Sequence, residues 1–179
     1  GHPTGFASVN GCTHPNSPSW HGLSSEDDEV LLDVVLLCCL TESMNASLLN
    51  SIYGNSKPTK ARELIQAILQ DEVKHAQIGW AYLSDVSSRR DCGFVAGYLH
   101  EMLDITVRDE LFLPVTDDDG MGSYDLGVMP LQSRLEQFCL TLDEVVTPGL
   151  AHFGIDTLAI ATWKNGKLTG RGLDLSKRL

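Results

Sequence analysis

The segment DEVKHAQIGWAYL, residues 71–83, carries a glutamate and a histidine three positions apart within a helical pattern of apolar residues. Side chains three or four positions apart lie on the same side of a helix. The stripe that contains Glu72 and His75 is otherwise apolar or small, and its members are Ile65, Ile68, Leu69, Ala76, Gly79, Tyr82 and Leu83. We therefore expect Glu72 and His75 to face the interior, with Gly79 letting a neighbouring helix come close.

A second carboxylate interrupts an apolar stripe earlier in the chain, at Glu42. Its helical neighbours at offsets of three, four and seven residues are Val35, Cys38, Cys39, Ala46 and Leu49. Burying an unpaired carboxylate is strongly unfavourable, so a partner is expected for Glu42.

The distribution of apolar residues and turn residues predicts an all-α chain. Ser25 and Asp28 resemble a capping box at the start of the first helix, and Pro148 is expected to end or kink the last one. The helices are expected at residues 26–53, 58–88, 92–112 and 130–152. They form one helical domain, residues 24–153, between an extended N-terminal arm or linker, residues 1–23, and an irregular C-terminal tail, residues 154–179.

The first two predicted helices should bring the three polar side chains together. If the turn between these helices centres near residue 57, Glu42 lies 15 residues before it and Glu72 lies 15 residues after it. In an antiparallel hairpin, equal distances from the turn place residues at the same height. Two carboxylates and an imidazole that meet inside a bundle form a suitable site for iron or manganese.

Three stretches resemble the helices of ferritin-like domains: LTES at residues 40–43, DEVKHAQIGW at residues 71–80 and LDEVVTPGL at residues 142–150. The resemblance covers roughly residues 28–153, and it is closest to the second half of certain uncharacterised bacterial proteins built from two helical hairpins. It implies an up-and-down bundle in which Glu42 and Glu72 are carboxylate ligands of a di-iron or iron–manganese site. His75 would be a nitrogen ligand, and Asp71 would accept a hydrogen bond from a metal-bound histidine.

The chain departs from the ferritin-like pattern because it carries only half of the usual ligand set. A complete site needs a second Glu and a second Glu-x-x-His, and the later helices offer only Glu101, Glu136 followed by Cys139, and Glu144 followed by Thr147. The other half would come from an N-terminal hairpin or from a second subunit in a homodimer, or it does not exist. Since the chain begins with glycine, we expect it to be part of a longer protein.

Composition argues against several classes of partner. The formal net charge of −11 and the absence of a basic stripe disfavour nucleic acid and anionic membranes. The apolar run VLLDVVLLCCL, residues 30–40, is too short to span a bilayer. An odd number of cysteines, five, without zinc-type spacing suggests buried thiols and a reducing cytoplasm.

Three further groups of residues have weaker interpretations. Cys12, His14 and His21 could form a zinc clip, but their spacing matches no structural zinc motif. The acidic loop at residues 117–119 lacks the distal glutamate of an EF-hand. His100 and Glu101 are interpreted as part of a solvated helix face.

The sequence therefore favours a non-haem iron protein that oxidises iron or an unidentified substrate with oxygen or peroxide, which would make it an oxidoreductase. The alternative is a metal-free helical module that mediates assembly, in which the former ligands form a buried polar pair. Resemblance indicates the fold more directly than the chemistry.

Overall fold

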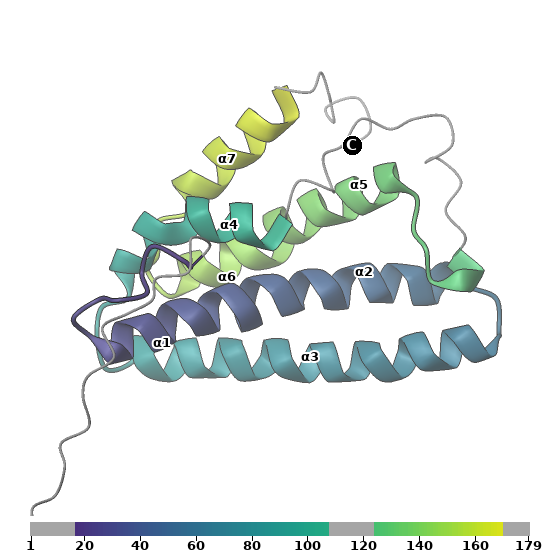
Figure 1. Ribbon diagram of the computed structural model, residues 1–179, viewed down its shortest axis with the longest axis horizontal. Helices are drawn as coiled ribbons and strands as arrows, with labels where there is room; N and C mark the ends of the chain where they lie inside the picture. Colours follow the sequence, from purple (N-terminus) through teal and green to yellow (C-terminus); the bar gives the residue numbers. More distant parts are fainter. Residues whose placement is uncertain (1–16, 108–123, 170–179) are drawn as a thin grey trace, which may run out of the picture.

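The computed structural model describes residues 17–107 and 124–169, and every regular element within these two ranges is helical (Figure 1). The all-α prediction is confirmed for this part of the chain. The N-terminal cysteine and histidine, Cys12 and His14, and the acidic loop at residues 117–119 lie outside the described residues.

Two long antiparallel helices form the hairpin that the sequence predicted. The first is continuous from Glu26 to Asn55 and comprises α1 (Glu26–Val34), a π-helical segment η1 (Val35–Thr41) and α2 (Glu42–Asn55). The second is α3 (Lys60–Ser87). The side chains of Ser25 and Thr59 cap the two N-termini by accepting the backbone N–H groups three residues further on.

The π-helical segment η1 ends immediately before Glu42. The backbone N–H of Glu42 donates to the carbonyl of Leu37, five residues back, and the Thr41 hydroxyl donates to the carbonyl of Leu36 at 2.9 Å. This widened turn changes the direction in which Glu42 leaves the helix relative to an unbroken α-helix. Such π segments within α-helices occur frequently at functional sites.

The remaining elements follow the hairpin in the order η2 (Gly93–Tyr98), α4 (Leu99–Val107), η4 (Tyr124–Leu126), α5 (Leu131–Thr141), η5 (Leu142–Val146), α6 (Thr147–His152) and α7 (Leu158–Thr169). The predicted third helix begins as a 3₁₀ turn, and its residues from 108 onwards lie outside the described ranges. The predicted fourth helix is present from Leu131 to His152. Pro148, which has no N–H to donate, follows a π-helical turn rather than ending the helix.

The prediction of an irregular C-terminal tail is wrong within the described residues. Residues 158–169, expected to be irregular, form α7, because Ile160 and Trp163 are buried against the helical domain and stabilise the helix. Part of the predicted N-terminal arm is also fixed, since Trp20 is fully buried and its indole N–H donates to Asp33 at 2.8 Å.

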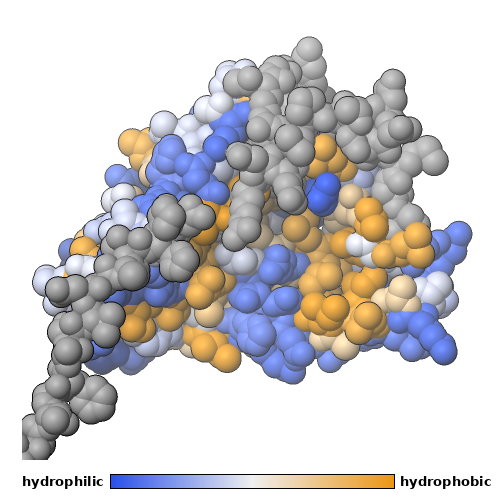
Figure 2. All heavy atoms as spheres, viewed as in Figure 1, coloured by the Kyte–Doolittle hydropathy of each residue, from blue (hydrophilic) through white to orange (hydrophobic). Residues whose placement is uncertain are grey.

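The helices form layers around α1–α2, which lies in the middle (Figure 1). The α3 helix lies along one side of this central helix, α4, α5 and α6 lie on the other, and α7 covers α4. The main hydrophobic core fills the space between these layers, and its largest fully buried side chains include Leu31, Leu32, Leu40, Leu83, Leu99, Met102, Leu103, Leu142 and Leu150. Figure 2 shows apolar surface interspersed with hydrophilic surface on the viewed face of the molecule.

Three of the four cysteines among the described residues, Cys39, Cys92 and Cys139, are buried, and Cys38 is half-buried. Cys38, Cys39, Cys92 and Cys139 are all free. Burial, with a smaller contribution from Cys38, raises the pKa of the Cys39 thiol to about 12, and burial raises that of Cys139 to about 11. A thiol that stays protonated is a poor nucleophile, so these two side chains act as small apolar groups.

Within the described residues, the continuous helix Glu26–Asn55 is long and apolar enough to cross a membrane by length and composition. The core helices of soluble proteins and signal sequences share this property. The apolar run at residues 30–40, which alone is too short to span a bilayer, is therefore part of a helix that is long enough to do so. That the protein has no membrane partner stays a prediction.

Candidate metal centre

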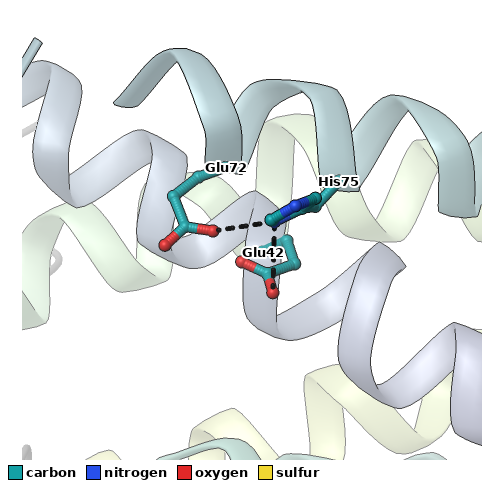
Figure 3. A group of neighbouring side chains, drawn as sticks. All are labelled: Glu42, Glu72 and His75. Atoms are coloured by element: carbon teal, nitrogen blue, oxygen red, sulfur yellow. Dashed lines mark ion pairs between the residues drawn. The ribbon is translucent and has the colours of Figure 1, made fainter. Parts of the chain in front are cut away.

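The hairpin brings Glu42, at the start of α2, next to Glu72 and His75 in the middle of α3. Figure 3 shows the three side chains pointing towards one another across the two helices. One ligand atom from each side chain lies within 4.8 Å of the other two. The equal spacing of Glu42 and Glu72 from the turn thus predicted their common height correctly.

The separations within this group leave room for a cation. His75 Nδ1 lies 3.5 Å from Glu72 Oε2 and 3.9 Å from Glu42 Oε1, longer than ordinary hydrogen bonds. Ligand atoms that bind one first-row metal ion at about 2.1 Å lie about 3–4 Å from each other. Small rotations of the three side chains would therefore allow all of them to bind the same ion.

Glu42 has the most unusual environment of the three residues. Its Oε2 atom is buried and has no hydrogen-bond partner among the described residues. Burial and the neighbouring carboxylate of Glu72 raise the pKa of Glu42, against the opposing effects of His75 and Asn45. A cation between the carboxylates would satisfy the buried oxygen and remove the repulsion between the two negative charges.

Gly79 brings the two helices together one turn beyond His75. A Cβ atom at Gly79 would lie 2.4 Å from Cys38 Cβ and 3.0 Å from the carbonyl carbon of Cys38. Only glycine allows the backbone of η1 to approach α3 this closely, so the predicted role of Gly79 is confirmed. The short distance between the helices is what lets Glu42 reach the side chains on α3.

The prediction that His75 faces the interior is wrong. The side chains of Glu42 and Glu72 are 23% and 19% exposed, whereas that of His75 is 54% exposed. The buried stripe of α3 runs through Glu72, Ala76 and Gly79, and His75 lies about 100° around the helix from Ala76. The site is therefore closed by the hairpin on the glutamate side and open to solvent on the histidine side.

Asp71 does not contact His75 in this structure. Lys74 and His75 lie three and four residues after Asp71, so both are neighbours of its carboxylate on the helix surface. The carboxylate pairs with Lys74 Nζ at 3.0 Å and is exposed. The structure thus gives no support, within this chain, to its predicted role behind a metal-bound histidine.

The other candidate ligands lie apart from this site. Glu101 accepts hydrogen bonds from the backbone and hydroxyl of Ser19, and Glu136 accepts one from Gln132 at 2.8 Å. His21 pairs with Asp33, and His100 pairs with Asp104. Among the described residues, Glu42, Glu72 and His75 are the one group of His, Cys, Asp or Glu with metal-binding spacing, which agrees with the half set predicted from the sequence.

Two features beside Glu42 were not predicted from the sequence, the side chain of Asn45 and the π-helical turn. Asn45 follows Glu42 by three residues, a spacing that places it on the same side of α2 and could have identified it. The turn at Val35–Thr41 contains neither proline nor glycine, so local sequence gave no signal for it.

The chain matches no family model, no curated protein and no solved structure. The ferritin-like resemblance therefore depends on the quoted motifs, and the bundle that it implies stays a prediction. What the candidate site can do must be argued from its own residues.

Proposed function

We propose that the protein binds iron or manganese through Glu42, Glu72 and His75, as half of a ferritin-like di-metal carboxylate site. Two observations of Glu42 carry this proposal: one of its oxygens converges with a ligand atom of Glu72 and of His75 within 4.8 Å, and its buried Oε2 atom has no hydrogen-bond partner among the described residues. Two carboxylates with one imidazole suit these metals better than calcium, which prefers six to eight oxygen ligands, or a closed structural zinc site.

Each residue has a distinct part in this proposal. Glu42 provides the buried oxygen, and the hairpin shields Glu42 and Glu72 from bulk water on the side of Gly79 and Cys38. His75 provides a neutral nitrogen ligand at the open side of the site. When bound there, iron would supply redox chemistry with oxygen or peroxide, either to oxidise iron itself or to oxidise an unidentified substrate.

A metal-free helical module is the second candidate function, and the close approach of the Glu42 and Glu72 carboxylates, which together with burial raises the pKa of Glu42, favours it. A protonated Glu42 could donate a hydrogen bond to Glu72, which would relieve the repulsion between the two carboxylates without a cation. In that case the three residues form a polar cluster, and the helices serve to present surfaces to another protein.

Anaerobic titration with ferrous iron, followed by metal analysis of the desalted protein, separates the two functions. We expect about one ion per chain, the number that half of a di-metal site would hold. A Glu72→Ala/His75→Ala variant should lose this ion. A Glu63→Ala/His152→Ala variant, which removes the same two residue types at exposed positions outside the site, should keep it.

Urea unfolding of the same variants gives a second comparison. If Glu42, Glu72 and His75 bind metal, iron should raise the urea midpoint of the unchanged protein and of the control variant, but not that of the site variant. Equal midpoints with and without iron, together with no retained metal, would contradict the proposal and favour the metal-free module.

A further inference from the structure

The side of the α2–α3 pair that carries His75 exposes a row of large apolar residues. Leu64, Ile68 and Ile78 on α3 are 63%, 41% and 64% exposed, and Leu37 on η1 is 54% exposed. Together with His75 these residues are called the open face. Four apolar side chains around a half-exposed histidine are an unusual composition for a surface that only meets water.

The antiparallel geometry of the hairpin places these residues on one side. Cys38 meets Gly79 where the helices touch, and Leu37 and Ile78 each precede one of these contact residues by one position. In antiparallel helices, such preceding residues turn towards the same side of the pair. Leu64, Ile68, His75 and Ile78 follow one another at spacings of four, seven and three residues, so they lie on a single stripe along α3, which also carries the exposed Asp71 between Ile68 and His75.

The opposite side of the hairpin is already covered. Trp80 on α3 donates to the Ser43 hydroxyl at 3.1 Å, stacks on Phe153 and lies against Gly149 of α6. The helices that complete the core therefore approach from the Trp80 side, and the described elements leave the open face bare.

The metal site is incomplete on this same side. Glu42, Glu72 and His75 supply two carboxylates and one nitrogen, which is too few to surround two metal ions without several water ligands. His75 lies at the boundary between the site and the open face, because its side chain is more than half exposed. A ligand set that approached from the open face would thus reach the metal directly.

We propose that a second copy of this chain docks on the open face through a two-fold axis and completes the metal site. The inference rests on the proposed function and names the partner of that site. A two-fold interface joins the same surface of both subunits, so the two copies together would supply two Glu42, two Glu72 and two His75 side chains. Every ligand that one copy lacks is present in the other at the symmetry-related position.

The whole side of the α2–α3 pair that carries the open face is large enough for a stable dimer. At about 1.5 Å per residue, the 28 residues of α3 extend for about 42 Å. Two helices side by side are about 20 Å wide, which gives on the order of 800 Å² per subunit, the area that a standard protein–protein interface buries on each partner. Leu37, Leu64, Ile68 and Ile78 would provide apolar contacts around the shared metal site.

Charge makes this dimer dependent on the metal. Docking brings four carboxylates, two from each copy, into one partly buried space, where their mutual repulsion is poorly screened. Divalent cations bound between the carboxylates would replace this repulsion by attraction between each carboxylate and the metal. The dimer should therefore form when metal is added and dissociate when the metal is removed by a chelator.

Sedimentation velocity of the 179-residue chain with and without manganese(II) tests the inference. We expect a monomer in chelator and a dimer with manganese. A Leu64→Lys variant should stay monomeric and bind manganese at least tenfold more weakly. Its new charge lies 11 residues, about 16 Å, from His75, more than the Debye length of about 10 Å at 0.1 M salt.

Leu158→Lys is the matched control, because Leu158 is 69% exposed on α7, away from the open face. This variant should dimerise as the unchanged protein does. Electron paramagnetic resonance gives an independent readout, since two manganese ions in one shared site couple magnetically. The Leu64→Lys variant should instead show the hyperfine pattern of isolated ions.

The possible failures of the two proposals differ. A chain that binds manganese tightly while sedimenting as a monomer would overturn the docking of a second copy. Glu42, Glu72 and His75 would still bind metal in that case, and the remaining ligands would be water or another protein segment. A chain that binds no manganese or iron in any oligomeric state would overturn the proposed function, and this inference with it.

Discussion

Replacing Gly79 by alanine tests whether the close approach of α3 and η1 holds the site together. The added Cβ would lie 2.4 Å from Cys38 Cβ, whereas ordinary van der Waals contact begins at about 3.4 Å. The next nearest atoms belong to the Cys38 backbone, which cannot rotate away as a long side chain could. The two helices must therefore separate locally by about 1 Å.

Two opposing effects determine the stability of Gly79→Ala. Alanine is favoured over glycine within a helix by about 1 kcal/mol, while inserting a methyl group into a well-packed contact costs about 1–3 kcal/mol. We expect a net loss of up to about 2 kcal/mol. Gly166, in α7, has no atom within 4 Å of its added Cβ. Gly166→Ala should therefore show only the gain of about 1 kcal/mol.

Urea unfolding followed by circular dichroism measures both variants against the unchanged protein. The difference between them isolates the cost of the contact, and we expect Gly79→Ala to be less stable than Gly166→Ala by about 1–3 kcal/mol. Metal titration adds a second readout, because separating the helices moves Glu42 away from Glu72 and His75. If Gly79→Ala proves as stable as Gly166→Ala, our account of how the hairpin positions the site is wrong.

Two further predictions concern the stability of the scaffold. Burial opposes the ionisation of Asp104. The hydrogen bonds from Lys167 and Trp163 and the charges of Lys167 and His100 outweigh burial, and they hold the pKa of Asp104 below its usual range. The stability that ionised Asp104 contributes is therefore present above about pH 3.9 and is lost as pH falls through the lower folded-state pKa. Asp104→Asn should be less stable than the unchanged protein by at most about 1 kcal/mol near neutral pH, and a difference in unfolding free energy that stays constant from neutral to strongly acidic pH would contradict this. Ser25→Ala should cost about 1 kcal/mol by removing the side-chain cap of α1; thermal unfolding measures the loss, and an unchanged midpoint would show that the cap contributes nothing.

Helical periodicity and turn residues predicted the parts of the fold that depend on local sequence. The caps at Ser25 and the break after Asn55 mark the ends of the first helix, and the common distance of Glu42 and Glu72 from the turn gives their register. These properties follow from the geometry of one antiparallel hairpin, which short-range patterns specify well.

The exposure of His75 and the formation of α7 could not be predicted from local sequence patterns, because both depend on which helix faces are covered by other helices. His75 belongs to a broad apolar stripe of α3, but only one edge of that stripe, through Ala76 and Gly79, meets the neighbouring helix. The helix α7 has little amphipathic character of its own and is stabilised by the burial of Trp163, whose indole N–H donates to Asp104 at 2.9 Å. Both outcomes depend on tertiary contacts between distant segments.

The exposure of His75, although it contradicts the sequence prediction, distinguishes the candidate functions. A metal-free module could use the bare apolar row of Leu64, Ile68 and Ile78 to contact another protein, but it gives no reason for a half-exposed imidazole beside Glu42 and Glu72. A shared metal site between two copies accounts for both observations, because the imidazole then lies at the centre of an interface and the apolar row lies around it. Contacts that surround the energetically important centre of an interface serve to exclude water from it, and Leu64, Ile68 and Ile78 would do so for the shared metal site.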